Sequence, residues 1–240
     1  MTPTREVSLP KTDTFSYYKA EGGAEVEFRL IYRGSLPPEK WSYTDQYARA
    51  EDKHKLRKHF HPQLRELWKQ HPDLRRMAKQ QFNVEGTGLA RRIVPVVQGQ
   101  VGKTWLEYIA DSWPRLGTRF VPLVSQQGEF TCSLDILFLR RGHPGDLIDS
   151  HGDIDSRIKV LLDGLRMPEQ VQELGGLPIE ADENPFYCLL SDDRLVTSIT
   201  VTTDRLLPPL ETEDRINDVV LIIHVIVNNP GAIFAGGRLV

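Results

Sequence analysis

Residues 152–165 read GDIDSRIKVLLDGL, and this stretch decides how the rest of the chain is interpreted. Its apolar residues recur at the three- and four-residue spacing of one helical face. They are Ile154, Ile158, Leu161, Leu162 and Leu165. The pattern predicts a helix over 153–166 that buries this face and is stopped by Met167-Pro168.

The segments around this helix predict a protein of the α+β class. Alternating or β-branched runs predict strands over 26–32, 119–125, 130–141, 195–203 and 219–227, and helical spacing predicts helices over 45–69, 72–81 and 105–113. Gln127-Gly128 would join the second and third strands as a hairpin, and Pro62 would kink or restart the long helix. With the last two strands consecutive in sequence, we expect a mixed or antiparallel sheet packed with helices.

Length and composition favour one globular domain. The chain has 240 residues, of which 40% are hydrophobic and 26% are charged. No stretch is long and apolar enough to span a membrane, and the first residues lack the apolar core of a secretory signal, so we expect a cytoplasmic protein. Residues 1–22 are predicted to be a flexible leader and residues 229–240 a C-terminal tail. The two cysteines are too few for a disulfide framework or a zinc module.

The charge is segregated along the chain. Residues 53–92 hold 11 Lys or Arg against three acids, whereas the whole chain has a net charge of −3. A basic region of this kind fits a polyanionic partner such as nucleic acid. A charge run taken alone is more often a solvated helical face, since such runs are common on exposed helices.

Acidic residues gather at two places. Asp155, Lys159 and Asp163 recur every four residues in the predicted helix, and Asp192-Asp193 precedes a strand. A capping aspartate, here Asp153 or Asp155, and a salt-bridged helix face would explain the first group. They do not explain an acidic pair beside a strand. If the carboxylates converge, they form an oxygen-only site that suits Mg²⁺, and Lys159 could stabilise charge developing on phosphorus.

These residues resemble the motifs of the RusA family of Holliday-junction resolvases. Asp153 and Asp155 match an Asp-x-Asp segment that opens a helix, Lys159 matches its lysine, and Asp193 matches the functional member of a later acidic pair. Ser156 stands where the family usually has Asn. The resemblance implies a RusA-like nuclease domain over 23–228, with insertions at about 70–118 and 169–185.

The resemblance also implies an activity: Mg²⁺-dependent cleavage of phosphodiester bonds in branched or structured DNA by a homodimer, with no membrane contact and with Mn²⁺ as the other suitable ion. The expected catalytic residues are Asp153, Asp155, Lys159 and Asp193, and the expected metal ligands are Asp153, Asp155, Asp192 and Asp193. The expected nucleic-acid contacts are Lys53, Lys55, Arg57, Lys58, Arg140, Arg141 and Arg157. Two other hypotheses remain: a non-catalytic nucleic-acid-binding or interaction module, and a metal-binding regulatory domain without a DNA partner.

Overall fold

The structure, a computed structural model, describes residues 26–38, 46–85, 92–96, 101–128, 130–141, 154–207 and 217–228. Within them the helices are α1 (Gln46–Gln70), α2 (Pro72–Lys79), α3 (Trp105–Ser112) and α4 (Ile154–Leu165). The strands are β1 (Val26–Ser35), β2 (Gln81–Glu85), β3 (Arg92–Pro95), β4 (Lys103–Thr104), β5 (Pro114–Arg115), β6 (Thr118–Val124), β7 (Thr131–Arg140), β8 (Phe186–Leu190), β9 (Val196–Arg205) and β10 (Asp218–Asn228). The predicted leader and tail lie outside the described residues.

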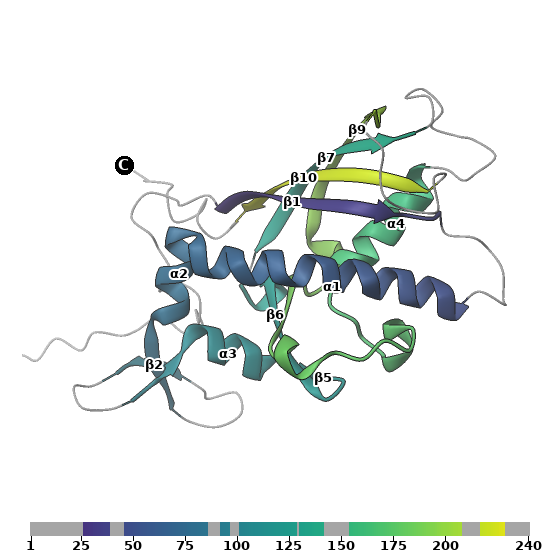
Figure 1. The fold of residues 1–240 in the computed structure, drawn as a ribbon. Helices are drawn as coiled ribbons and strands as arrows, with labels where there is room; N and C mark the ends of the chain where they lie inside the picture. The colour runs from purple at the N-terminus through teal and green to yellow at the C-terminus, as the bar shows by residue number, and fades with distance from the viewer. Residues whose placement is uncertain are drawn as a thin grey trace, which may run out of the picture.

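The largest sheet is mixed, so the α+β prediction is confirmed. Its strand order is β1-β10-β7-β9. The first two pairings are antiparallel and the third is parallel. Helices α1 and α4 lie on one face of this sheet (Figure 1).

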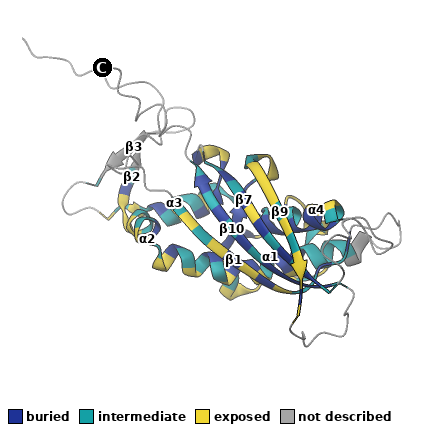
Figure 2. Ribbon diagram, turned by 90° about the horizontal axis from the view of Figure 1, so that it is seen from above, coloured by how far each residue is buried: buried dark blue, intermediate teal, exposed yellow. Residues whose placement is uncertain are grey.

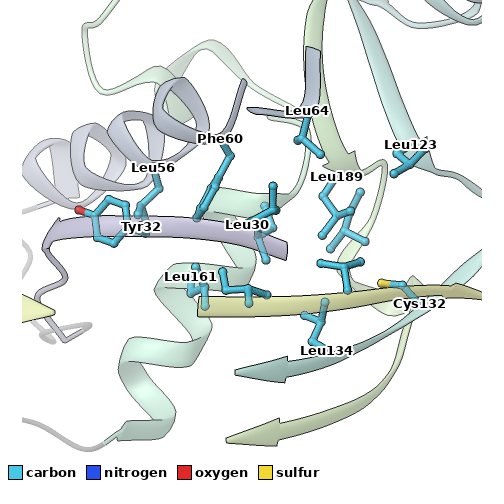
Figure 3. Close-up of a cluster of buried hydrophobic side chains, with 14 of the residues drawn as sticks. Leu30, Tyr32, Leu56, Phe60, Leu64, Leu123, Cys132, Leu134, Leu161 and Leu189 are labelled. Carbon is cyan, nitrogen blue, oxygen red and sulfur yellow. The ribbon is translucent and has the colours of Figure 1, made fainter. Parts of the chain in front are cut away.

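The core forms where the two helices meet the sheet. Helix α1 contributes Leu56, Phe60 and Leu64, whose four-residue spacing aligns them on one face (Figure 3). The sheet contributes alternate residues of β1, β7 and β10, of which Leu30 and Leu134 are examples. Helix α4 adds Leu161 and its apolar neighbours, so the buried face predicted from residues 152–165 is confirmed for the described part of that stretch.

The predicted hairpin between residues 119–125 and 130–141 is wrong. Strand β6 pairs with β5 and, in parallel, with β8, whereas β7 lies between β10 and β9 in the large sheet. A short 3-10 turn, η4 (Gln126–Gly128), follows β6, and the Gly128 N–H bonds to the Ser125 carbonyl at 3.0 Å. The two apolar runs are adjacent in sequence and share one core, but each pairs in a different sheet.

The region expected as a first insertion, residues 70–118, holds more structure than the sequence indicated. Helix α2 ends at Lys79 rather than at residue 81. Strand β2 starts at Gln81 and pairs with β3 and β4. Strand β3 lies in a stretch where the sequence pattern predicted no strand. Helix α1 runs through Pro62 as one element and does not restart there.

The second expected insertion packs along α1. We call residues 169–185 the acidic segment, because it contains five Asp or Glu and no Lys or Arg. It forms the short 3-10 turns η5 (Val171–Leu174) and η6 (Ala181–Glu183). Gly175 adopts a positive φ of 57°, and a Cβ atom built there would lie 2.1 Å from the Glu51 backbone nitrogen. The segment therefore approaches α1 as closely as a glycine permits.

Candidate functional site

Asp155 and Lys159 lie next to each other on the solvent-facing side of α4. The same helix buries Ile158, Leu161 and Leu165, so the amphipathic pattern directs the polar residues outward. The Lys159 Nζ atom is 3.9 Å from Asp155 Oδ2, and the two side chains are 65% and 67% exposed. A carboxylate and an ammonium are thus presented together to solvent.

The other charged residues of α4 are built into the fold. Asp163 lies 2.6 Å from Lys53 Nζ and 3.1 Å from Arg166 Nε. Its partial burial raises the pKa of this carboxyl, but the hydrogen bonds to Lys53 and Arg166 outweigh that effect and hold the pKa below its usual value. The Arg157 guanidinium is buried and donates to the Leu36 carbonyl. Asp163 and Arg157 therefore support the helix rather than a surface site.

The second acidic pair lies at the short 3-10 turn η7 (Asp193–Leu195) that leads into β9. Asp192 is its N-cap and accepts a hydrogen bond from the Arg194 backbone N–H at 3.0 Å. The Arg194 side chain also lies 2.6 Å from Asp192 Oδ2. The Arg194 bonds hold the pKa of Asp192 well below its usual range. Asp193, in contrast, is exposed.

The two acidic positions lie toward opposite ends of α4. The Met167 N–H, just after the helix, bonds to the Leu190 carbonyl at 2.9 Å, and Asp193 follows Leu190 by three residues. Asp155 is in the first turn, and Leu165 at the end of the helix is about 15 Å away along the axis at 1.5 Å per residue. Within the described residues, no three His, Cys, Asp or Glu side chains are grouped closely enough to hold a metal ion. Asp153 lies outside the described residues.

The exposed carboxylates suit a hard divalent cation chemically. Asp155 and Asp193 offer oxygen donors, the ligand type of Mg²⁺ and Mn²⁺. Asp192 fits less well, because a metal ion would have to displace Arg194 from it. The donor type thus fits at Asp155 and at Asp193, but the two carboxylates lie toward opposite ends of α4 and do not form one metal site in this structure.

Three of the seven predicted nucleic-acid contacts are buried, and we no longer assign them to a binding surface. They are Arg57, Arg140 and Arg157. Arg57 is only 2% exposed, and its guanidinium donates to the Arg166 and Glu173 carbonyls at 3.0 and 2.8 Å. These bonds satisfy the guanidinium inside the protein, so it cannot reach a phosphate.

The other four predicted nucleic-acid contacts lie nearer the surface, and each forms an ion pair. Lys53 pairs with Asp163, Lys55 with Glu51, Lys58 with Glu183, and Arg141 with Asp218. Lys58 Nζ also donates to the Pro178 carbonyl at 2.8 Å. Of these four lysines and arginines, only Lys55 keeps most of its side chain in solvent.

The structure also identifies exposed bases that the sequence pattern did not single out. Arg75 and Lys79 lie on the outer side of α2, whose inner side buries Leu74. The spacing of Leu74, Met77 and Ala78 could have indicated this orientation, since the three fall on one helical face.

Two histidines of α1 are buried against β8, which the sequence did not suggest. His54 and His61 stack against Phe186, with ring centroids 6.1 and 4.5 Å away. His61 Nδ1 accepts from the Tyr187 N–H at 2.9 Å. Burial lowers the pKa of each histidine to about 4. Both are therefore neutral at pH 7.

Comparison with protein-family models, with curated protein sequences and with solved structures finds no match. None of the helices in the described part of the chain is long and apolar enough to cross a membrane.

Proposed function

We propose that this protein is a Mg²⁺-dependent endonuclease that cleaves phosphodiester bonds in branched or structured DNA. The observation that carries the proposal is the exposed Asp155–Lys159 pair at the start of α4, in the Asp-x-Asp and lysine spacing of the RusA-like motif. Asp193 supports it, because it is exposed and lies on a turn that contacts the same helix.

The residues of the chain take distinct roles in this proposal. Asp155 would offer Mg²⁺ a carboxylate at the start of α4, and Asp193 would offer one toward the other end of the helix; the two would contact one ion only if this region rearranged. A bound ion would supply positive charge at the scissile phosphate and a more acidic bound water. Lys159, between the two acidic positions, stabilises negative charge that develops on the phosphate oxygens. Its ammonium can move toward a phosphate at little cost, because a 3.9 Å exposed ion pair is weak.

The first experiment measures Mg²⁺ binding and DNA cleavage by Asp155→Asn and Asp193→Asn. Each change removes a ligand charge at nearly constant shape, so we expect cleavage to fall by at least about 10³-fold with an unchanged melting temperature. Asp182→Asn is the matched control, since this exposed aspartate lies in the acidic segment. Full cleavage by either site variant would refute the assignment of that residue.

The second experiment separates catalysis from metal binding. Lys159→Ala should lose roughly 10²–10³-fold in turnover and keep its Mg²⁺ affinity, because the side chain acts on developing charge. Lys159→Arg should recover part of the loss. The substrate panel is a four-way junction, a flap and linear duplex. Tight binding of the junction without cleavage in Mg²⁺ or Mn²⁺ would reject the nuclease and favour a non-catalytic nucleic-acid-binding module.

A further inference from the structure

The hairpin of strands β5 and β6, together with Asn184, lines an open depression of about 420 Å³. The depression lies on the side of α1 opposite the four-stranded sheet, where Figure 1 places β5. Pro114, Gly117 and Asn184 on its lining are exposed, so a small molecule can enter from solvent. The volume is within the range of small-ligand sites in proteins, about 300–1,000 Å³.

Two guanidinium groups line this depression, and the first belongs to Arg115. It lies over the Trp113 ring, with the Arg115 Cζ atom 5.6 Å from the ring centroid. Among the described residues, none forms an ion pair or a hydrogen bond with the Arg115 side chain. A guanidinium that stacks on an aromatic ring still presents its N–H groups at its edge. Arg115 is therefore a positioned cation whose donors are available to a ligand.

The second guanidinium, that of Arg119, is held from two sides. Its Nη1 atom is 3.2 Å from Asp111 Oδ1, and its Nε atom donates to Asn184 Oδ1 at 3.4 Å. Because the amide oxygen of Asn184 accepts this bond, its Nδ2 group remains as a donor. Asp111 also lies 2.7 Å from Lys103 Nζ. One carboxylate thus faces two cations, and Arg115 adds a third positive charge.

The depression borders the acidic segment, but among the described residues that line it none is acidic. Asn184 is the one residue of the acidic segment in the lining. The neighbouring Glu183 pairs with Lys58, and the exposed Asp182 does not line the depression. The charged lining groups are therefore both cations, a set that favours an anionic ligand.

Two features of the hairpin are unfavourable for stability and lie in the same lining. Leu116 and Gly117 have positive φ angles of 53° and 78°, as in a type I′ turn, where Asn, Asp or Gly is the usual residue at the Leu116 position. The Thr118 hydroxyl is buried and has no hydrogen-bond partner within the described part of the chain. Strained backbone is concentrated at ligand-binding sites, and a buried polar group without a partner requires an explanation such as a missing water or ion.

We propose that this depression binds the phosphate group of a small phosphorylated molecule. The guanidinium groups of Arg115 and Arg119 contact the phosphate oxygens, and the Asn184 amide adds a neutral donor. A guanidinium binds phosphate through two parallel N–H bonds, so two of them select a polyatomic oxyanion. Pro114 and Leu116 supply apolar surface for the remainder of the ligand. The proposal uses no residue of the candidate active site and does not depend on the nuclease activity.

The test is isothermal titration calorimetry of the full chain with adenosine monophosphate, inorganic phosphate and adenosine. We expect adenosine monophosphate to bind with a dissociation constant below about 1 mM, inorganic phosphate to bind more weakly, and adenosine not to bind. Arg115→Ala should weaken both phosphate compounds at least about tenfold, with an unchanged melting temperature, since the side chain has no hydrogen-bond partner to lose.

The control variant is Arg205→Ala, which removes an exposed arginine from another part of the molecule. Arg205 belongs to β9, the largely exposed strand at the edge of the four-stranded sheet in the view from above (Figure 2). This variant has the same change in net charge as Arg115→Ala and should bind adenosine monophosphate with wild-type affinity. Equal losses in the two variants would show that net charge, and not the depression, sets the affinity, and would overturn the proposal.

Three other results would also overturn it. The first is that neither phosphate compound binds at millimolar concentration. The second is that adenosine binds as tightly as adenosine monophosphate, because the phosphate would then not be the recognised group. The third is that Arg115→Ala weakens the binding of duplex DNA and leaves the affinity for adenosine monophosphate unchanged, which would assign Arg115 to a nucleic-acid surface.

Discussion

Helices α1 and α4 both carry polar side chains at four-residue spacing, but the two sets lie in different environments. On α1 the series Lys53, Arg57, His61 and Arg65 faces α4, β8 and the acidic segment. On α4, Asp155 and Lys159 face solvent. The first series packs against other parts of the chain, and the second is available to a ligand.

The difference follows from what packs over each helix. Arg57 is 2% exposed and bonds to two carbonyls and to the Glu173 carboxylate, whereas Lys159 is 65% exposed with one weak partner. A buried charge that loses its partner costs several kcal/mol, but an exposed pair contributes at most about 1 kcal/mol. A run of like charges in the sequence does not distinguish these two cases.

The largest expected effect is on stability when the buried charge is removed. Arg57→Ala should lower the free energy of unfolding by about 3 kcal/mol, because it leaves the Arg166 and Glu173 carbonyls without their donor and opens a cavity at a buried position. Urea unfolding followed by circular dichroism measures it. Arg75→Ala, on the exposed side of α2, should change stability by less than about 0.5 kcal/mol. Equal losses of stability in the two variants would show that the burial of Arg57 does not distinguish it from the exposed Arg75.

The next effect is a pH dependence of the free energy of unfolding, which comes from the buried side of α1. Burial, with the charges of Arg57 and Lys58, lowers the pKa of His54 to about 4 from 6.5. Between these values the unfolded chain binds a proton that the folded chain does not, so stability falls as the pH falls, by about 1.4 kcal/mol per unit. His54→Leu should therefore reduce the stability difference between pH 7 and pH 5 by about 2 kcal/mol. Lys159→Ala should leave that difference intact.

A smaller effect is expected on DNA binding. Arg75→Ala with Lys79→Ala should flatten the dependence of log affinity on log salt by up to about 1.8, because each phosphate contact releases condensed counterions. Lys53→Ala, which breaks the ion pair with Asp163, should leave the slope unchanged. Fluorescence anisotropy in Ca²⁺ measures binding while cleavage is suppressed. An unchanged slope in the double variant would exclude α2 from the nucleic-acid surface.

The smallest effect is on the free energy of unfolding when Lys55 is removed. Lys55 is one of the predicted nucleic-acid contacts on α1, and most of its side chain is in solvent. Lys55 lies 2.7 Å from Glu51 in an i,i+4 pair, with 56% of its side chain exposed. Lys55→Ala should lower the free energy of unfolding by less than about 0.5 kcal/mol. A loss as large as that for Arg57→Ala would show that exposure does not separate the two kinds of charge on this helix.

Local patterns predicted much of the fold. The spacing of Leu56, Phe60 and Leu64 predicted α1, and that of Ile158, Leu161 and Leu165 predicted α4. Alternation predicted β1, β7, β9 and β10 and a mixed or antiparallel sheet, and the parallel β7–β9 pairing makes the sheet mixed. In the candidate site, the spacing of Asp155 and Lys159 predicted that they are neighbours, because residues four apart share a helix face.

The sequence by itself therefore determined the four helices, the strands of the large sheet and which side of α4 is buried, since periodicity depends only on near neighbours in the chain. Only the tertiary structure decided that β6 and β7 join different sheets, that Asp193 lies toward the opposite end of α4 from Asp155, and that Arg57 is buried. These depend on contacts between distant segments: Arg57 and Glu173 are 116 residues apart. No local pattern encodes such a partner, because whether a charge is buried depends on what the rest of the chain packs over it.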